Sequence, residues 1–253
     1  MNDKVSIEKV SPKDHPGVVA DEIVASINDS IDDHGRCTLA LAGGGTPSSV
    51  YRLLSRPPRV REIDWTKVQL FWGDERWVPD DHYKSNFLMV QETLLSHIQI
   101  PAENVHAIQT NLESPQQAAE AYADEIRKVF GLGQGELPKF DLVLLGLGKD
   151  GHIASLFPES STLDLSGAIC HATVAPDDDK MRITLAPDVL INARRLIFIV
   201  TGRGKAEVIK RVFEGEESYN QLPAKIYERS QGHVTWFLDT GAALHLQVPT
   251  VLG

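Results

Sequence analysis

The sequence predicts an α/β fold: a doubly wound, mostly parallel sheet flanked by helices. Two observations support this fold. Short, almost continuously apolar segments alternate along the chain with segments whose apolar residues follow helical spacing. Strands of that composition are typical of parallel sheets that are covered on both faces. In addition, unusual glycine-rich loops follow several strands, at the carboxyl ends where such sheets bind ligands.

Five segments are expected to be helices because their apolar residues recur at helical intervals. In the first, Val19, Ile23, Ile27 and Ile31 form a stripe four residues apart. Pro47 suits the first turn of the second helix. The fourth begins with a capping serine at position 114, a proline after it and a glutamine three residues on. The expected helices are residues 15–33, 47–54, 85–98, 114–130 and 205–213.

Six strands are expected, and the first core strand is placed after about 35 residues that supply one helix. The fourth strand is the weakest because its alternation is poor. No internal repeat or low-complexity segment interrupts the chain, and the glycine-rich residues 131–135 are the best linker candidate. We expect a single domain over residues 1–253. The expected strands are residues 37–42, 68–72, 140–145, 181–185, 195–201 and 234–238.

Composition excludes several classes of protein. The chain has 253 residues, 25 Lys and Arg against 35 Asp and Glu, and a net charge of −10, which argues against nucleic-acid or anionic-membrane partners. Cys37 and Cys170 are too few for a disulfide framework and are expected to be buried free thiols. The N-terminus does not resemble a signal peptide, and the apolar runs are too short to span a bilayer. We therefore expect a cytoplasmic protein.

The loop from Gly43 to Pro47 is a candidate phosphate site. Its three glycines allow close approach of the backbone, the following helix presents free N–H groups, and Thr46 adds a hydroxyl. It has neither the lysine and spacing of a Walker loop nor the GxGxxG pattern. The alternative is a tight turn between a strand and a helix, without a ligand.

Three further segments carry basic or acidic side chains near expected strand ends. Arg76 follows Asp74 and Glu75 and suits a phosphate group, although a local ion pair is the alternative. Lys205 begins a helix after a strand, where it would hold phosphate or simply be solvated. Arg182 is another basic candidate.

His152 lies among glycines directly after an apolar strand, so we expect it at the carboxyl edge of the sheet. An ordinary histidine pKa of about 6.5 suits a general base, and Asp150 is close enough to orient the ring. A histidine on a flexible surface loop is the alternative. The chain has no GxSxG motif, so Ser155 is disfavoured as a nucleophile, and no metal-ligand spacing is present.

These segments, in this order, resemble the 6-phosphogluconolactonases over residues 40–236. The most specific matches are GDERWVP, SNF and GLGKDGHIASLFP. The resemblance implies a Rossmann-type, phosphosugar-isomerase-like fold with a small added sub-element, shared with glucosamine-6-phosphate deaminase. It also implies hydrolysis of 6-phospho-D-glucono-1,5-lactone to 6-phosphogluconate in the pentose phosphate pathway, without a metal or organic cofactor.

The resemblance also assigns roles within the site. His152 becomes the general base, Asp150 its orienting partner, and Asp74 an acid whose role in hydrolysis is less defined. Backbone N–H groups of residues 146–151 are candidates for holding the oxyanion. The residues proposed to hold the 6-phosphate are Gly44, Gly45, Thr46, Arg76, Arg182 and Lys205.

Two alternatives remain. A glucosamine-6-phosphate deaminase would carry an Asn-Glu-Pro sequence where this chain has Leu-Phe-Pro after Ser155. A sugar-phosphate-binding module without catalysis would need an output domain that one preceding helix does not supply. We expect a monomer or small homo-oligomer with a sugar phosphate lactone as its ligand.

Overall fold

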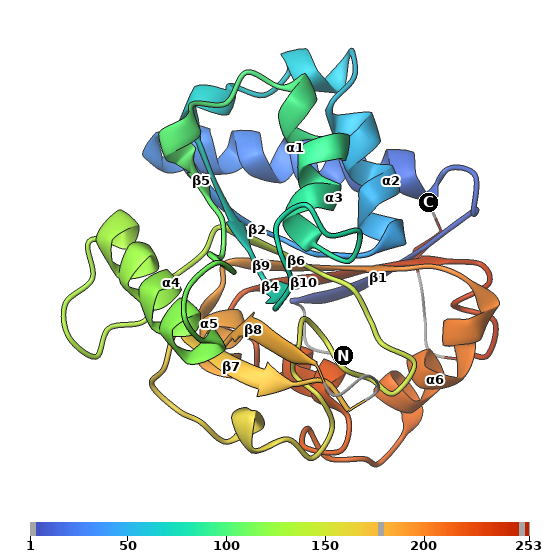
Figure 1. The fold of residues 1–253 in the computed structure, drawn as a ribbon. Coiled ribbons are helices and arrows are strands. Elements are labelled where there is room, and N and C mark those ends of the chain that lie inside the picture. Colours follow the sequence, from blue (N-terminus) through green and yellow to red (C-terminus); the bar gives the residue numbers. More distant parts are fainter. Residues whose placement is uncertain (1–3, 177–179, 248–250, 253) are drawn as a thin grey trace.

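The computed structural model describes residues 4–176, 180–247 and the backbone of 251–252. Eight strands form one sheet in the order β11-β1-β10-β9-β6-β2-β3-β5, and each neighbouring pair is parallel (Figure 1). The doubly wound parallel fold is therefore confirmed. The strands are β1 (Val5–Val10), β2 (Cys37–Leu41), β3 (Val68–Trp72), β5 (Val105–His106), β6 (Leu142–Leu145), β9 (Arg195–Val200), β10 (His233–Asp239) and β11 (Val251–Leu252).

Helices cover both faces of the sheet. Figure 1 shows α1, α2 and α3 on one side and α4, α5 and α6 on the other. The central strands β2 and β6 are buried along their whole length, which explains their continuous apolar sequences. The helices are α1 (His15–His34), α2 (Gly45–Leu54), α3 (Asn86–Thr93), α4 (Pro115–Phe130), α5 (Pro187–Asn192) and α6 (Ala206–Glu214).

A second, antiparallel sheet of three strands is the small added sub-element. Its order is β4 (Asp74–Arg76), β8 (Met181–Leu185) and β7 (Cys170–Val174). Only Gly73 separates β3 from β4, so the chain passes directly from the large sheet into the small one. The weak strand expected at 181–185 is confirmed, whereas β4 and β7 were not expected as strands.

The expectation that one helix alone precedes the first core strand is wrong. Strand β1 pairs with β10 over six residues. Only Ile7 and Val10 of β1 are buried, so the segment has no continuous apolar run. Its partner lies more than 220 residues away in the sequence, beyond the reach of any local pattern.

The helix expected over residues 85–98 is also shorter than predicted. Ser85 caps its start by accepting a hydrogen bond from the N–H of Leu88, as the expected boundary requires. The helix ends at Thr93, because Leu94 leaves helical geometry with φ −132° and ψ −65°. A short 3₁₀ turn, Leu95–His97, follows.

The start and end of α4 follow the predicted capping. The Ser114 side chain accepts from the N–H of Gln117, and Gly131 closes the helix in the left-handed region with φ 65°. Cys37 and Cys170 are both buried and unpaired. Within the described part of the chain, no helix has the length and apolar character needed to cross a membrane.

Candidate active site

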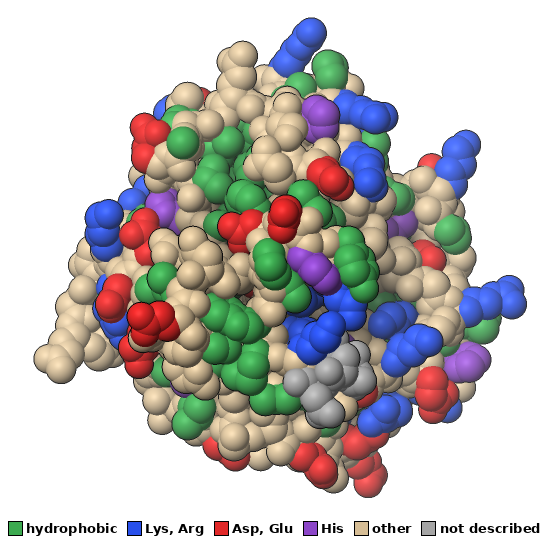
Figure 2. All heavy atoms as spheres, viewed as in Figure 1, with side chains coloured by type: hydrophobic (Ala, Val, Ile, Leu, Met, Phe, Trp, Pro, Cys, Tyr) green, Lys and Arg blue, Asp and Glu red, His purple; other side chains and the backbone are tan. Residues whose placement is uncertain are grey.

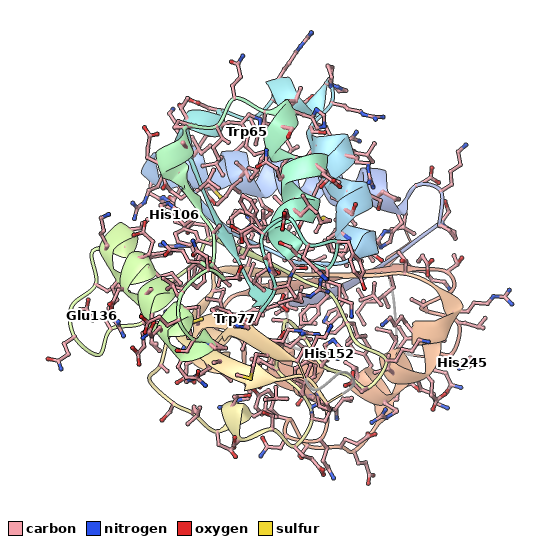
Figure 3. The ribbon with its side chains drawn as sticks, in the orientation of Figure 1. Trp65, Trp77, His106, Glu136, His152 and His245 are labelled. Carbon is pink, nitrogen blue, oxygen red and sulfur yellow. The ribbon has the colours of Figure 1, made fainter. Side chains whose placement is uncertain are left out.

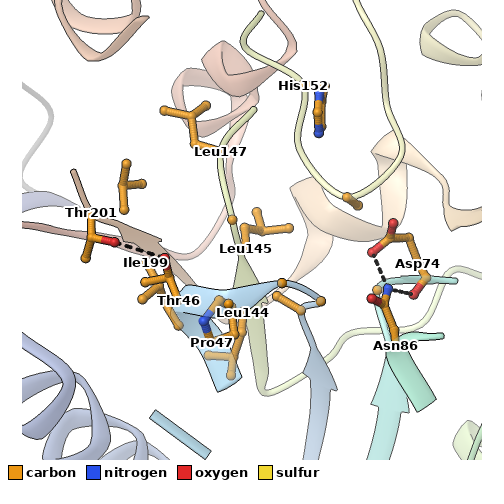
Figure 4. A pocket seen from close by; sticks show the side chains of 18 of the residues that line it. Thr46, Pro47, Asp74, Asn86, Leu144, Leu145, Leu147, His152, Ile199 and Thr201 are labelled. Atoms are coloured by element: carbon orange, nitrogen blue, oxygen red, sulfur yellow. Dashed lines mark hydrogen bonds between the residues drawn. The ribbon is translucent and has the colours of Figure 1, made fainter. Parts of the chain in front are cut away.

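A cavity of about 270 Å³ opens at the carboxyl ends of four adjacent strands, β9, β6, β2 and β3 (Figure 4). The chain winds outward in opposite directions from β2 and β6, so the cavity lies at the switch point where doubly wound sheets bind ligands. Its described lining comprises Ala42, Gly43, Gly44, Gly45, Thr46, Pro47, Gly73, Asp74, Arg76, Asn86, Leu144, Leu145, Gly146, Leu147, His152, Ala154, Ile199, Val200, Thr201 and Lys205.

The glycine loop forms one wall of this cavity. Gly44 has φ 100°, a conformation that favours glycine, and it lets α2 begin at Gly45. The first N–H groups of α2 have no partner within the helix and carry its positive dipole end. The Thr46 hydroxyl lies 2.9 Å from the Thr201 hydroxyl and so ties this loop to the loop after β9 (Figure 4). The wall is suited to an anion such as phosphate.

His152 lies on the opposite wall, with its ring held in place on several sides. The Nδ1 atom is 2.7 Å from Oδ1 of Asp150, which also accepts the His152 N–H. The ring packs against Phe157 with 5.0 Å between ring centroids. A Cβ atom on Gly148 would be 2.2 Å from Nδ1, so the ring occupies space that only glycine leaves free. Among the described residues, Nε2 of His152 has no hydrogen-bond partner.

The contact with His152 determines the charge of Asp150. Burial alone would raise the pKa of Asp150, but the hydrogen bond from His152 and its charge outweigh burial and lower that pKa. Asp150 is therefore anionic near neutral pH and fixes which nitrogen of His152 faces the cavity. Figure 3 shows His152 near the centre of the molecule, whereas His106 and His245 lie away from it.

Asp74 lines the cavity just after β3 and is itself held by two side chains. Ser155 Oγ donates to Oδ2 of Asp74 at 2.7 Å. The Asn86 amide donates to the backbone oxygen of Asp74 at 2.9 Å and lies 3.4 Å from Oδ1 (Figure 4). Ser155 is thus engaged with an acid, an arrangement that differs from the serine–histidine contact of a nucleophilic hydrolase.

Glu75 is buried beside the site and does not line the cavity. It is 2% exposed, and its carboxylate accepts from the N–H groups of Arg76, Asn86 and Phe87, each at 2.7 Å. Burial raises the pKa of Glu75 to about 7, although these donors act in the opposite direction. The local ion pair between Asp74 and Arg76 that the sequence left open is not among the contacts of the described residues.

The basic side chains lie around the same opening. Lys205 lines the cavity and donates through Nζ to the backbone oxygen of Leu147, and burial lowers its pKa. Arg76 also lines the cavity and donates to the backbone oxygen of Lys84. Arg182 is directly opposite Arg76 in the small sheet, although it is not part of the cavity lining. Figure 2 shows Lys and Arg side chains gathered around the place where Figure 3 labels His152.

The structure thus gathers most of the residues that the sequence singled out. Asp150 and Arg182 do not line the cavity, but Asp150 hydrogen-bonds to His152 and Arg182 is opposite Arg76 in the small sheet. Sequence reasoning missed Thr201 and Asn86 as parts of the site. Two signals for Asn86 were available: the N-cap serine at position 85, which places Asn86 at the start of a helix, and the SNF match. Within the described residues, no three His, Cys, Asp or Glu side chains lie together as a metal site would require.

The fold and the cavity define an α/β protein with a cavity suited to a small anionic ligand at the carboxyl edge of its parallel sheet. Residues 11–236 match the family model described as glucosamine-6-phosphate isomerases/6-phosphogluconolactonase. The chain belongs to this family.

Individual relatives agree with the family match. A 6-phosphogluconolactonase of Synechocystis sp. is 36% identical over 225 residues, which are 89% of this chain and 91% of that protein. The solved structure of 6-phosphogluconolactonase from Trypanosoma cruzi is 29% identical, with a TM-score of 0.86 over 98% of this chain and 99% of that one. A monomeric glucosamine-6-phosphate deaminase shares the fold at 20% identity, with a TM-score of 0.80 over 95% of this chain and 99% of that one.

Proposed function

We propose that the chain is a 6-phosphogluconolactonase that hydrolyses 6-phospho-D-glucono-1,5-lactone to 6-phosphogluconate. The observation that carries this proposal is the His152–Asp150 pair, joined at 2.7 Å on the wall of a cavity whose other wall is suited to phosphate. The match to relatives named 6-phosphogluconolactonase over most of the chain supports the same substrate.

The proposed reaction uses His152 as general base. Its Nε2 atom takes a proton from water while the water oxygen forms a bond to C1 of the lactone, and the carbonyl oxygen becomes an oxyanion. When the carbonyl re-forms, the bond between C1 and the ring oxygen breaks. The ring oxygen then takes the proton from His152. Asp150 keeps Nδ1 occupied and stabilises the charged ring between these two steps.

The oxyanion requires hydrogen-bond donors from the loop after β6. The N–H groups of Gly148 and Gly151 already bond within this loop, to the oxygens of His152 and Gly148 at 2.8 and 3.2 Å. Gly146 and Leu147 are the loop residues on the cavity wall, so their N–H groups are the better candidates. Such donors act best when they are fixed before the reaction.

The 6-phosphate is assigned to the opposite wall. The N–H groups of Gly44 and Gly45 and the Thr46 hydroxyl lie on this wall. Lys205 and Arg76 line the same cavity and add positive charge, and Arg182 faces Arg76 in the small sheet. Binding energy from this group, which lies far from the reacting carbon, positions C1 near His152.

A coupled assay tests the proposed function. Glucose 6-phosphate and its dehydrogenase generate the lactone, and excess 6-phosphogluconate dehydrogenase reports the product as a second NADPH. After correction for spontaneous opening of the lactone, the second phase should accelerate in proportion to the amount of added protein. An unchanged second phase at micromolar protein would refute the proposal.

A further inference from the structure

The side chain of Asn86 lies between the glycine loop and Asp74 in the cavity lining. A Cβ atom on Gly43 would be 2.0 Å from Oδ1 and 2.6 Å from Nδ2 of Asn86, so the amide lies directly against the glycine loop. The same amide donates to Asp74. Asn86 is 1% exposed and is therefore packed tightly between the loop and the acid.

The placement of Asn86 depends on Glu75. Asn86 and Phe87 are the first two residues of α3, and their N–H groups would lack partners in an isolated helix. The two carboxylate oxygens of Glu75 accept these N–H groups, and Ser85 accepts the third, from Leu88. The start of α3 is thus fixed to β4, the strand that also carries Asp74.

Asp74 is held from two sides by this arrangement. Ser155, which is on the same loop as His152, donates a hydrogen bond to Oδ2 of Asp74, and the Asn86 amide lies next to Oδ1. If the amide of Asn86 were lost, the carboxylate would keep a single side-chain donor and could rotate. A displacement of about 1 Å in an active site is enough to lower turnover by about 100-fold.

We propose that Asn86, clamped by Glu75 at the start of α3, is a positioning residue that fixes the Asp74 carboxylate against the cavity. The kinetic tests of this inference rest on the proposed function, because they measure turnover of the lactone. The proposal gives a function to two buried polar groups, the Glu75 carboxylate and the Asn86 amide, which the packing of an apolar core would not require. It also explains why position 43 has no side chain.

Paired variants test the proposal in the lactone assay. Asn86→Ala should lower kcat by roughly 10- to 100-fold with a smaller change in KM. In an Asp74→Ala background, the same substitution should change kcat by no more than about twofold, because its effect passes through Asp74. Equal losses in both backgrounds would overturn the proposal, as would full activity of Asn86→Ala.

Gly43→Ala provides an independent approach, because its Cβ would displace the amide from the opposite side. Gly43→Ala should lower kcat as much as Asn86→Ala does. In the double variant the further loss should be small, because alanine at position 86 leaves room for the added Cβ. Thr93→Val is the matched control. Thr93 donates to the Met89 oxygen in the last turn of the same helix, so its loss should leave kcat unchanged. A loss in Thr93→Val as large as in Asn86→Ala would contradict the proposal.

A crystal structure of Asn86→Ala separates this inference from the proposed function. The proposal predicts that the Asp74 carboxylate rotates away from the position it has beside Ser155 and Asn86. An unmoved carboxylate would overturn the proposal even if the wild-type chain proved inactive on the lactone, a result that would refute the proposed function alone.

Discussion

The His152 ring lies directly over Gly148, where a Cβ atom would be 2.2 Å from Nδ1 of His152 and 2.4 Å from Oδ1 of Asp150. Gly148→Ala should therefore push the pair apart and lower kcat by roughly 100-fold, the size of effect expected when a general base is misplaced. Steady-state kinetics would measure this change. A stable variant with wild-type kcat would contradict the placement of the ring.

Gly17→Ala is the matched control for this glycine substitution. Gly17 lies in the first turns of α1, and the nearest atom to its added Cβ would be 3.7 Å away. Alanine favours a helix over glycine by up to about 1 kcal/mol, so this variant should be as active as the wild type and slightly more stable.

Arg76→Ala tests the assignment of the phosphate wall. Phosphate holding is largely uniform binding, which is the same in the ground state and the transition state, so its loss should raise KM by roughly 10-fold with a smaller change in kcat. Arg127→Ala, which removes an exposed arginine paired with Asp124 on α4, should change neither constant. A loss of kcat at constant KM would instead place Arg76 among the groups that act on the reacting atoms.

Glu75 should make the stability of the folded chain depend on pH. Its pKa is raised from 4.5 to about 7 by burial, so between these values the unfolded chain releases a proton that the folded chain keeps. Stability from this group is fully present below pH 4.5, falls as pH rises, and levels off above pH 7. The shift corresponds to about 3 kcal/mol at most.

Urea unfolding of the wild type and Glu75→Gln from pH 4.5 to 8 measures this dependence. Glutamine does not titrate, so the difference in the free energy of unfolding between the two proteins should shift in favour of the variant as pH rises. A difference that stays constant over this range would show that Glu75 has an ordinary pKa.

Tyr51 connects α2 to the end of β2, where the sheet meets the cavity. Its hydroxyl accepts from the N–H of Ala42 and donates to the oxygen of the same residue, both at 2.9 Å, in a fully buried position. Tyr51→Phe leaves both backbone groups unpaired and should destabilise the chain by about 1–3 kcal/mol.

Thermal or urea unfolding of Tyr51→Phe checks this value. Tyr83→Phe is the control, because Tyr83 is 80% exposed and its hydroxyl should contribute within about 0.5 kcal/mol. Equal stability of the two variants would mean that the Ala42 groups find other partners. Tyr122 makes the same pair of bonds to Trp72, at 2.8 and 2.9 Å, so the feature occurs at two neighbouring strand ends.

The parallel sheet could be predicted from the sequence because its central strands are apolar throughout. β3 lies where the apolar run Val68–Trp72 predicts it, and β2 and β6 differ from their predictions only at the ends. β1 and β7 could not be predicted, since their residues are only partly buried. In addition, the pairing of β1 depends on a strand distant in the sequence. A strand has a continuous apolar sequence only where it is buried along its length, and in β1 only Ile7 and Val10 are buried.

The parts of the site that could be predicted are those whose functional residues lie next to a distinctive local sequence. The glycines beside His152 and those after β2 mark loops at strand ends, and the structure brings both to one cavity. The SNF segment drew attention to Asn86, but its role could not be predicted, because its contacts are with Gly43 and Asp74, 43 and 12 residues away. The facing of Arg76 and Arg182 likewise depends on the register of the small sheet, which no local pattern reveals.

The most direct test of His152 as the general base is the comparison of wild type with His152→Gln, using lactone turnover together with calorimetric binding of 6-phosphogluconate. Removal of the base should lower kcat by roughly 10²- to 10⁴-fold, while the dissociation constant of 6-phosphogluconate stays within about threefold, because the phosphate wall is untouched. Retention of wild-type kcat would contradict the account.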